Sequence, residues 1–362
     1  MNERSASPRA DSSSHFEPSA FVSPSAWRAH ELGSKESIAE DLDSRQRASL
    51  LDAVNANRSL AADAITRRSF RPRGFDEILS RWRNTVAHGT GLVLLRGLPI
   101  EDLDVEDCCR LFYGLGTHLG VAVSQSNDGE KIGHVVNLGG QDRRRRAYQN
   151  ARSLNLHTDR CDTVGMLCIR PAAAGGLSGY ASALAVHNEI LESRPELLSA
   201  LYRGFRLHRF GEQAGDDPLT AQPVPVFSVC EGVPNVVYIR GYIDLALDEG
   251  HYVLTPTERD ALDYFDEVAN RPEFRLDLRL ESGEATFTNN ARLLHRRNAF
   301  EDSDDPAKSR HLLRLWLMDP ELPAVPAVQA HKSLTGIARI EGRGTYYQGA
   351  GYNQELKSET GY

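Results

Sequence analysis

A histidine and an aspartate separated by one residue, His157 and Asp159, are the residue types and spacing that most suggest metal chemistry in this chain. Residues i and i+2 project from the same face of an extended strand, so both side chains can reach one ion. His187 and Glu189 have the same spacing, but they lie in a helical pattern, where side chains two residues apart point about 200° from each other. That pair is therefore a poor chelate. Taken alone, His157 is equally compatible with a loop histidine in an ordinary hydrogen bond.

A third potential ligand, His295, follows the strand-like segment 284–290, and two arginines, Arg310 and Arg314, begin fifteen residues after it. One carboxylate and two imidazoles can occupy three positions on one side of an Fe(II) ion, leaving the opposite face for a bidentate 2-oxo acid and O₂. A 2-oxo acid with a distal carboxylate also needs a fixed guanidinium, because arginine offers a planar, bidentate fork. The residue types therefore indicate iron-dependent oxygen chemistry.

The order of these motifs resembles the taurine/2,4-D dioxygenase (TauD/TfdA) family of Fe(II)/2-oxoglutarate oxygenases over about residues 90–320. The motifs that carry the resemblance are His157-x-Asp159, Gly175-Gly176-Leu177-Ser178, His295 and Arg310-x-x-x-Arg314. The resemblance implies that iron binds His157, Asp159 and His295, and that Ser178 and Arg310 hold the C5 carboxylate of 2-oxoglutarate. The family often has threonine at the position of Ser178, so the hydroxyl group is retained here. No further catalytic residue is implied beyond the metal site.

The spacing of the two arginines gives them different tasks. On a strand they share a face but lie roughly 13 Å apart, so one carboxylate cannot be bound equally by both. We assign 2-oxoglutarate to Arg310, whereas Arg314 either contacts an anionic substrate group or braces the metal site through an ion pair. The resemblance places four more residues in the substrate pocket: Gln125, Tyr148, Gln149 and Arg240. The four consecutive arginines at 143–146 form either a solvated loop or a mobile lid.

The elements that must position these residues follow from hydrophobic periodicity and end signals. The predicted helices cover residues 45–66, 75–88, 104–115, 187–205 and about 256–269, the last one opened by a capping box at Thr255. The predicted strands cover residues 91–97, 121–126, 163–170, 273–280, 284–288 and 310–318. We therefore predict an α+β protein, and the resemblance implies a double-stranded β-helix (a jelly-roll, cupin-like core) flanked by helices.

Residues 1–26 are predicted to be a disordered or loosely docked tail, because they hold eight serines and three prolines and few large apolar residues. Residues 27–362 are predicted to form one oxygenase domain. Cys161 and Cys168, which flank the segment after the metal motif, are interpreted as small core residues rather than ligands.

Composition excludes several classes of protein. The formal net charge of -8 argues against a general nucleic-acid binder, which normally carries a basic surplus. No stretch approaches the roughly 20 apolar residues of a membrane span. The N-terminus lacks the apolar segment of a secretory signal, and the five scattered cysteines fit neither a disulfide scaffold nor a CxxC pair. We therefore expect a cytoplasmic protein whose partner is a small molecule, with no nucleic acid and no membrane.

The resemblance implies an enzyme that uses Fe(II), 2-oxoglutarate and O₂ to hydroxylate an unactivated C–H bond, releasing succinate and CO₂. The expected substrate is a specialised metabolite or an amino-acid derivative. Asp159 argues against a halogenase, because chloride would need its coordination position. Desaturation or oxidative cyclisation by the same chemistry, a non-catalytic metal and 2-oxoglutarate sensor, and a protein hydroxylase are the alternatives. The sequence leaves the prime substrate and the oligomeric state open.

Overall fold

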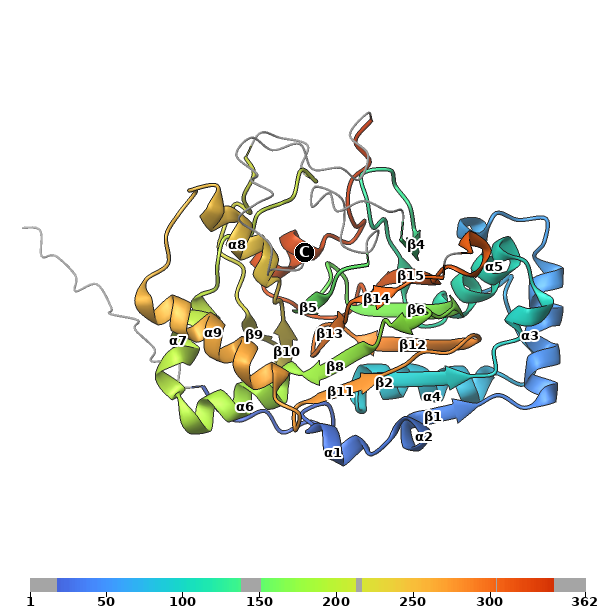
Figure 1. Cartoon of the computed structure of the whole chain (residues 1–362), viewed down its shortest axis with the longest axis horizontal. Coiled ribbons are helices and arrows are strands. Elements are labelled where there is room, and N and C mark those ends of the chain that lie inside the picture. Colours follow the sequence, from blue (N-terminus) through green and yellow to red (C-terminus); the bar gives the residue numbers. More distant parts are fainter. Residues whose placement is uncertain (1–17, 138–150, 213–216, 304, 342–362) are drawn as a thin grey trace, which may run out of the picture.

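The computed structural model describes residues 18–137, 151–212, 217–303 and 305–341, and it has a larger and a smaller sheet with helices around them (Figure 1). The α-helices are α1 (Ala29–Leu32), α2 (Lys35–Ile38), α3 (Ser44–Ala56), α4 (Asp76–His88), α5 (Val105–Gly116), α6 (Ala183–Ser193), α7 (Leu198–Arg203), α8 (Arg240–Asp248), α9 (Pro256–Asn270) and α10 (Pro326–Lys332). The strands are β1 (Ala39–Asp41), β2 (Leu92–Arg96), β3 (Val121–Ala122), β4 (Ile132–Val136), β5 (Leu154–His157), β6 (Thr163–Arg170), β7 (Ala174–Gly175), β8 (Ser178–Ser182), β9 (Phe227–Cys230), β10 (Val233–Val236), β11 (Arg275–Leu278), β12 (Glu284–Asn289), β13 (Leu293–Arg297), β14 (Phe300–Glu301) and β15 (His311–Met318).

The larger sheet has the strand order β1-β2-β12-β6-β15-β3, and β4 also pairs with β15. Helices α3, α4 and α5 lie beside this sheet at the right of Figure 1. Leu313, Leu315 and Leu317 of β15 belong to the same buried cluster as Trp82 of α4 and Phe112 of α5. Because side chains alternate along a strand, residues 312, 314 and 316 must project from the opposite face, toward the smaller sheet.

The smaller sheet has the order β11-β8-β13-β5, and α6, α7 and α9 lie next to it (Figure 1). Ala181 and Leu294 from this sheet pack in one buried cluster with Phe265 of α9. Its register places His295 of β13 opposite His157 of β5. Antiparallel pairing therefore brings together two histidines that are far apart in the sequence.

Two predicted helices are shorter than expected. The helix predicted over residues 45–66 ends at Ala56, because the side chain of Asn57 donates from Nδ2 to the carbonyl oxygens of Ala53 and Ser69. The helix predicted over residues 187–205 is divided into α6 and α7 at Pro195, which lacks the N–H group that a continuous helix would need.

The other predicted elements are close to those observed. The strand 163–170 is confirmed as β6, and the capping box is confirmed because Thr255 Oγ1 accepts from the backbone N–H of Glu258. The strand predicted over 273–280 is reduced to β11, and the extended piece at 121–126 contributes only β3 to the sheet. The α+β class is confirmed. No helix in the described part of the chain is both long and apolar enough to cross a membrane.

The described end of the predicted tail, which was expected to be disordered or loosely docked, makes specific contacts with the rest of the chain. Phe21 exchanges backbone hydrogen bonds with the side-chain amide of Asn188, at 2.8 and 2.9 Å, and its ring lies 4.4 Å from the ring of His187. Ser182 donates to the carbonyl of Ser25 at 2.6 Å. Residues 1–17 lie outside the described residues, and one domain over residues 27–362 stays a prediction.

Candidate active site

The predicted metal ligands lie together at the edge of the smaller sheet. His157 ends β5, Asp159 follows two residues later, and His295 lies in the neighbouring strand β13. Asp159 Oδ1 is 3.6 Å from His157 Nε2, and Asp159 Oδ2 is 3.5 Å from His295 Nε2. All three ligand atoms lie within 4.8 Å of one another. One ion placed among these atoms could bind all three.

The two imidazoles have the protonation that a metal requires. His157 Nδ1 lies 2.8 Å from the carbonyl oxygen of Asn155. A carbonyl only accepts, so Nδ1 carries the proton and Nε2 presents its lone pair toward Asp159. Burial, together with repulsion from His157, lowers the pKa of His295, which keeps that ring neutral. Neutral imidazole is the form that coordinates a metal.

Asp159 is held as a carboxylate. Burial alone would raise its pKa, but the positive charge of the nearby Arg314 guanidinium opposes burial, and the pKa lies well below its ordinary value. Arg314 Nη1 is 3.4 Å from Asp159 Oδ2, and Trp316 Nε1 donates to the same oxygen at 2.8 Å. Both residues come from β15, so the larger sheet orients a ligand that follows a strand of the smaller one.

The backbone around Asp159 is fixed by a residue that the sequence analysis missed, Asn290. Its Oδ1 accepts from the N–H of Asp159 at 2.9 Å. Its Nδ2 donates to the carbonyls of Asp159 and Cys161, at 2.7 and 2.6 Å. The only sequence signal was a pair of asparagines at the end of a buried strand, and such a pair does not indicate its partner.

A cavity next to this cluster lies between the two sheets. Side chains from both sheets line it: Val135, Leu154, His157, Val164, Met166, Ser178, Tyr180, Thr288, His295, Arg296, Arg297, Arg310 and Arg314. The structure therefore brings the predicted 2-oxoglutarate residues, Ser178 and Arg310, to the same cavity as both predicted histidine ligands. Arg310 and Arg314 also reach this cavity together, although Arg310 precedes β15 and the register shifts between His311 and Leu312.

Arg310 is a cation placed for an anionic ligand. Its side chain is buried, its guanidinium lies 4.9 Å from the ring centre of Phe300, and burial lowers its pKa to about 10. Within the described residues, the buried Nη1 atom has no hydrogen-bond acceptor. A buried guanidinium without an acceptor is costly unless a ligand supplies one. The C5 carboxylate of 2-oxoglutarate fits this requirement, as the two imidazoles and one carboxylate fit Fe(II).

A third buried arginine of this cavity, Arg297, was not identified from the sequence. Its guanidinium also lies 4.9 Å from the ring centre of Phe300, and burial and the nearby Arg310 lower its pKa to about 9. Its place two residues after His295 is visible in the sequence, but only the fold shows that it faces the same cavity as Arg310. The positive charge at this end of the cavity is therefore larger than one arginine provides.

Gln125 was predicted in the substrate pocket, but it lies behind Arg314 and does not line the cavity. Arg314 Nε donates to Gln125 Oε1 at 2.7 Å, and Gln125 Nε2 donates to the carbonyls of Arg314 and Lys131. Gln125 is 1% exposed. Gln125 lies in the loop before β4, and this loop packs against β15. Gln125 therefore positions Arg314, the arginine that contacts Asp159. Of the two readings left open for Arg314, the ion pair to the metal site is the one observed.

Arg240 was also predicted in the substrate pocket, but it is not among the residues that line the cavity beside His157 and His295. Its guanidinium binds Asp244, Asp263 and Asp266 at 2.9, 2.9 and 3.0 Å, which joins α8 to α9. Its donors are thus engaged in holding two helices together. The remaining substrate candidates, Tyr148 and Gln149, and the arginine run 143–146 lie outside the described residues.

Another group with metal-binding atoms consists of His208, Glu249 and His251. The N–H of Phe210 donates to His208 Nδ1 at 2.9 Å, so the ring proton lies on Nε2, which donates to Glu249 Oε2 at 3.1 Å. A nitrogen that carries a proton cannot bind a metal. This group is therefore a hydrogen-bonded cluster, and the His157 group remains the candidate metal centre.

Comparisons with known proteins agree with this geometry. Residues 58–316 match the family model "Taurine catabolism dioxygenase TauD, TfdA family". FR-33289 synthase of Streptomyces rubellomurinus (strain ATCC 31215) is 30% identical over 301 residues, which cover 81% of this chain and 88% of that protein. Uridine-5'-phosphate dioxygenase of an Amycolatopsis species is 32% identical over 154 residues, which cover 42% of this chain and 54% of that protein.

A solved structure shows the same fold at low sequence identity. Asparagine oxygenase in complex with Fe(II), 2S,3S-3-hydroxyasparagine and succinate superimposes with a TM-score of 0.64 at 17% identity. The match covers 78% of this chain and 93% of that protein.

Proposed function

Because the chain belongs to the TauD/TfdA family of non-haem iron dioxygenases, which use 2-oxoglutarate and O₂, we propose that it hydroxylates a C–H bond of a small molecule. The substrate is a specialised metabolite or an amino-acid derivative. We also propose that the two sheets form the double-stranded β-helix of this family, since both sheets contribute side chains to one cavity.

The observation that carries this proposal is the metal centre and its adjoining buried cation. His157, Asp159 and His295 present two neutral nitrogens and one carboxylate oxygen within 4.8 Å. Arg310 and Ser178 line the cavity beside them. A metal site beside a buried arginine suits an ion that binds a 2-oxo acid. A purely structural ion would need no carboxylate-binding arginine next to it.

Each group has a definite task. His157, Asp159 and His295 would hold Fe(II), and Arg310 with Ser178 would hold the C5 carboxylate of 2-oxoglutarate. When bound, iron and 2-oxoglutarate supply the activation of O₂ and the electrons for the reaction. Arg314 and Trp316 keep Asp159 ionised and oriented, and Asn290 fixes its backbone. The apolar residues Val164 and Met166 exclude water from the cavity wall.

Succinate formation tests this proposal. The protein is supplied with Fe(II), 2-oxoglutarate and O₂, alone and with a panel of amino acids, taurine and nucleotides. We expect iron-dependent succinate formation that at least one panel member accelerates, with a product that has gained one oxygen atom. The control is Asp159→Ala, which removes a ligand and should form no succinate.

The other outcomes have distinct meanings. A product that has lost two hydrogen atoms would replace hydroxylation by desaturation or ring closure. Iron and 2-oxoglutarate binding without any succinate would contradict the proposal and indicate a non-catalytic sensor.

A further inference from the structure

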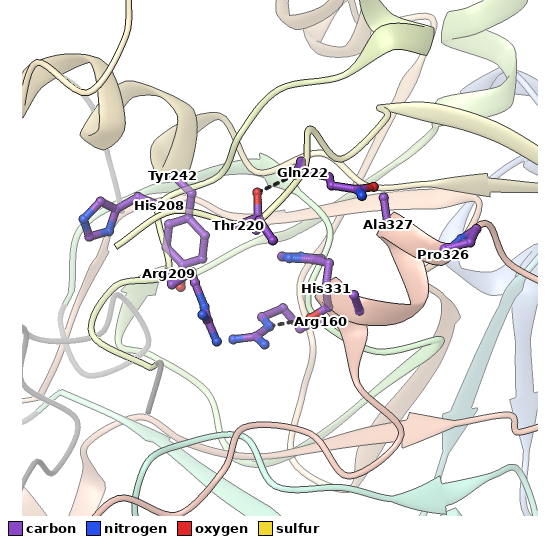
Figure 2. A pocket seen from close by; sticks show the side chains of 11 residues that line it. Arg160, His208, Arg209, Thr220, Gln222, Tyr242, Pro326, Ala327 and His331 are labelled. Carbon is purple, nitrogen blue, oxygen red and sulfur yellow. Dashed lines mark hydrogen bonds between the residues drawn. The ribbon is translucent and has the colours of Figure 1, made fainter. Parts of the chain in front are cut away.

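A cavity of about 370 Å³ lies apart from the one described above, between residues 208–209, residues 220–222, α8 and α10 (Figure 2). Pockets for small organic ligands typically measure about 300–1,000 Å³. Arg160, which follows Asp159 directly in the chain, contributes to its wall. Adjacent α-carbons are about 3.8 Å apart, so this wall is continuous with the metal-binding loop.

One end of this cavity is cationic. Figure 2 shows the guanidinium groups of Arg160 and Arg209 directed to the same part of the cavity, with the ring of His331 beside them. Arg160 Nε donates to the His331 carbonyl at 2.9 Å, and its Nη1 donates to Glu212 Oε2 at 2.7 Å. Within the described residues, Arg209 has no ion-pair partner. Glu212 thus offsets one of the two arginine charges.

His331 adds a buried polar atom without a partner among the described residues to this end of the cavity. The residue is 5% exposed, and within the described residues its Nε2 has no hydrogen-bond partner. Burial, followed by repulsion from Arg160, Lys332 and Arg209, holds the pKa of His331 well below its ordinary value. Of these cations, Lys332 already binds Asp162 at 2.8 Å. A buried polar atom without a partner is costly, so a ligand that forms a hydrogen bond with Nε2 is favoured here.

The opposite wall is apolar and makes the cavity larger than an inorganic anion needs. Pro326, Ala327 and Ala330 of α10 form this wall. The cavity therefore suits a molecule with an anionic end and an organic body. The side chains of Arg160, Arg209 and His331 come from three separate segments of the chain and line this end of the cavity (Figure 2). A phosphoryl-type group has three terminal oxygens to contact them, whereas a carboxylate has two.

We propose that this cavity binds the phosphoryl or phosphonyl group of the enzyme's organic prime substrate, with Arg209, Arg160 and His331 as its ligands. This assignment rests on the proposed function, because it places the bound molecule next to the loop that carries Asp159. Free phosphate offers the same oxygen atoms and could also bind in this cavity. The experiment therefore distinguishes free phosphate from a phosphorylated organic molecule.

The test uses the protein loaded with Fe(II) and 2-oxoglutarate in the absence of O₂. Calorimetric titration measures its affinity for uridine 5'-phosphate, uridine and inorganic phosphate. We expect uridine 5'-phosphate to bind at least about tenfold more tightly than uridine, the effect of one charge-assisted hydrogen bond. Arg209→Gln and His331→Phe should each remove most of that difference.

The matched control is Arg203→Gln, which changes an exposed arginine of α7 whose Nη1 contacts only Ser199 Oγ among the described residues. It should bind all probes as the unchanged protein does. Thermal unfolding midpoints of the variants exclude loss of folding as the cause.

Three results would overturn the proposal. These are equal affinities for uridine 5'-phosphate and uridine, an undiminished preference in both Arg209→Gln and His331→Phe, and binding of inorganic phosphate alone. Succinate formation is measured in parallel. If binding depends on Arg209 but no succinate forms, the proposed function is wrong and the proposed phosphate site stands. If succinate forms but binding does not depend on the phosphate group, the proposed function stands and the phosphate site is wrong.

Discussion

The guanidinium of Arg314 lies against the carboxylate of Asp159, with Nη1 3.4 Å from Oδ2. Arg310, four residues earlier, instead lies over the Phe300 ring at the end of the cavity that Ser178 lines. We therefore propose separate tasks for the two arginines, Arg314 at a metal ligand and Arg310 at the cosubstrate.

Arg310→Lys should raise the KM for 2-oxoglutarate about a hundredfold, because lysine keeps the charge and loses two directed hydrogen bonds. Iron affinity should be nearly unchanged, since the guanidinium is not a ligand. Ser178→Ala should act in the same direction and more weakly. Steady-state kinetics at saturating iron measures both effects. An unchanged KM in Arg310→Lys would remove this residue from the cosubstrate site.

Arg314→Lys should weaken iron binding roughly 10- to 100-fold, the range seen when a partner of a metal ligand is removed. Lysine cannot both donate to Gln125 and contact Asp159 in the same geometry. The KM for 2-oxoglutarate should change little once iron is saturating. If the large KM effect appeared here and not in Arg310→Lys, the two roles would have to be exchanged.

Asn290→Ala should lower the free energy of unfolding by about 3 kcal/mol, because it leaves the buried N–H of Asp159 and two carbonyls without partners. Iron affinity should fall as well, since the loop that carries Asp159 loses its clamp. Denaturant unfolding and iron titration measure the two effects, and Asn55→Ala at an exposed position of α3 is the control. Unchanged iron affinity would mean that Asn290 supports the fold alone.

The candidate metal ligands could be named from the sequence because their signals are local or fixed in order. His157 and Asp159 are two residues apart, and His295 and Arg310 follow in the order that the resemblance expects. The strand β6 was likewise predicted from its own segment, residues 163–170.

The residues that were missed or misplaced depend on tertiary contacts. Asn290 acts on a loop more than a hundred residues away, and Arg297 is recognisable only from the cavity that it faces. Arg240 was placed in the substrate pocket because its aspartate partners on α9 lie distant in the sequence. The predicted helix over 45–66 likewise ends because Asn57 binds Ser69, a contact that periodicity does not contain.

Arg240→Met should lower the free energy of unfolding by about 2 kcal/mol, since it breaks partly buried ion pairs between α8 and α9. The KM for 2-oxoglutarate and the affinity for iron should stay unchanged. Denaturant unfolding and kinetics on the same preparation provide the comparison. A raised KM with unchanged stability would restore the substrate role that the ion pairs argue against.

Stability should fall as the pH decreases from about 6.5 to 4. His187 is fully buried, and burial lowers its pKa to about 4, whereas the ordinary value of 6.5 applies in the unfolded chain. A depressed pKa gives stability that is present above pH 6.5 and lost on acidification, here on the order of 3 kcal/mol. His187→Gln should make the unfolding free energy less pH-dependent in this range, and exposed His30→Gln should not. Parallel slopes in all three proteins would contradict this account.

The central claim is that one Fe(II) ion is held by His157, Asp159 and His295. Anaerobic titration of Fe(II), followed by calorimetry, tests it most directly in the unchanged protein and in the three single alanine variants. We predict one site per chain in the unchanged protein and a large loss of affinity in every variant, with thermal unfolding of the metal-free proteins nearly the same. Undiminished affinity in any one variant would remove that residue from the metal centre and contradict the account.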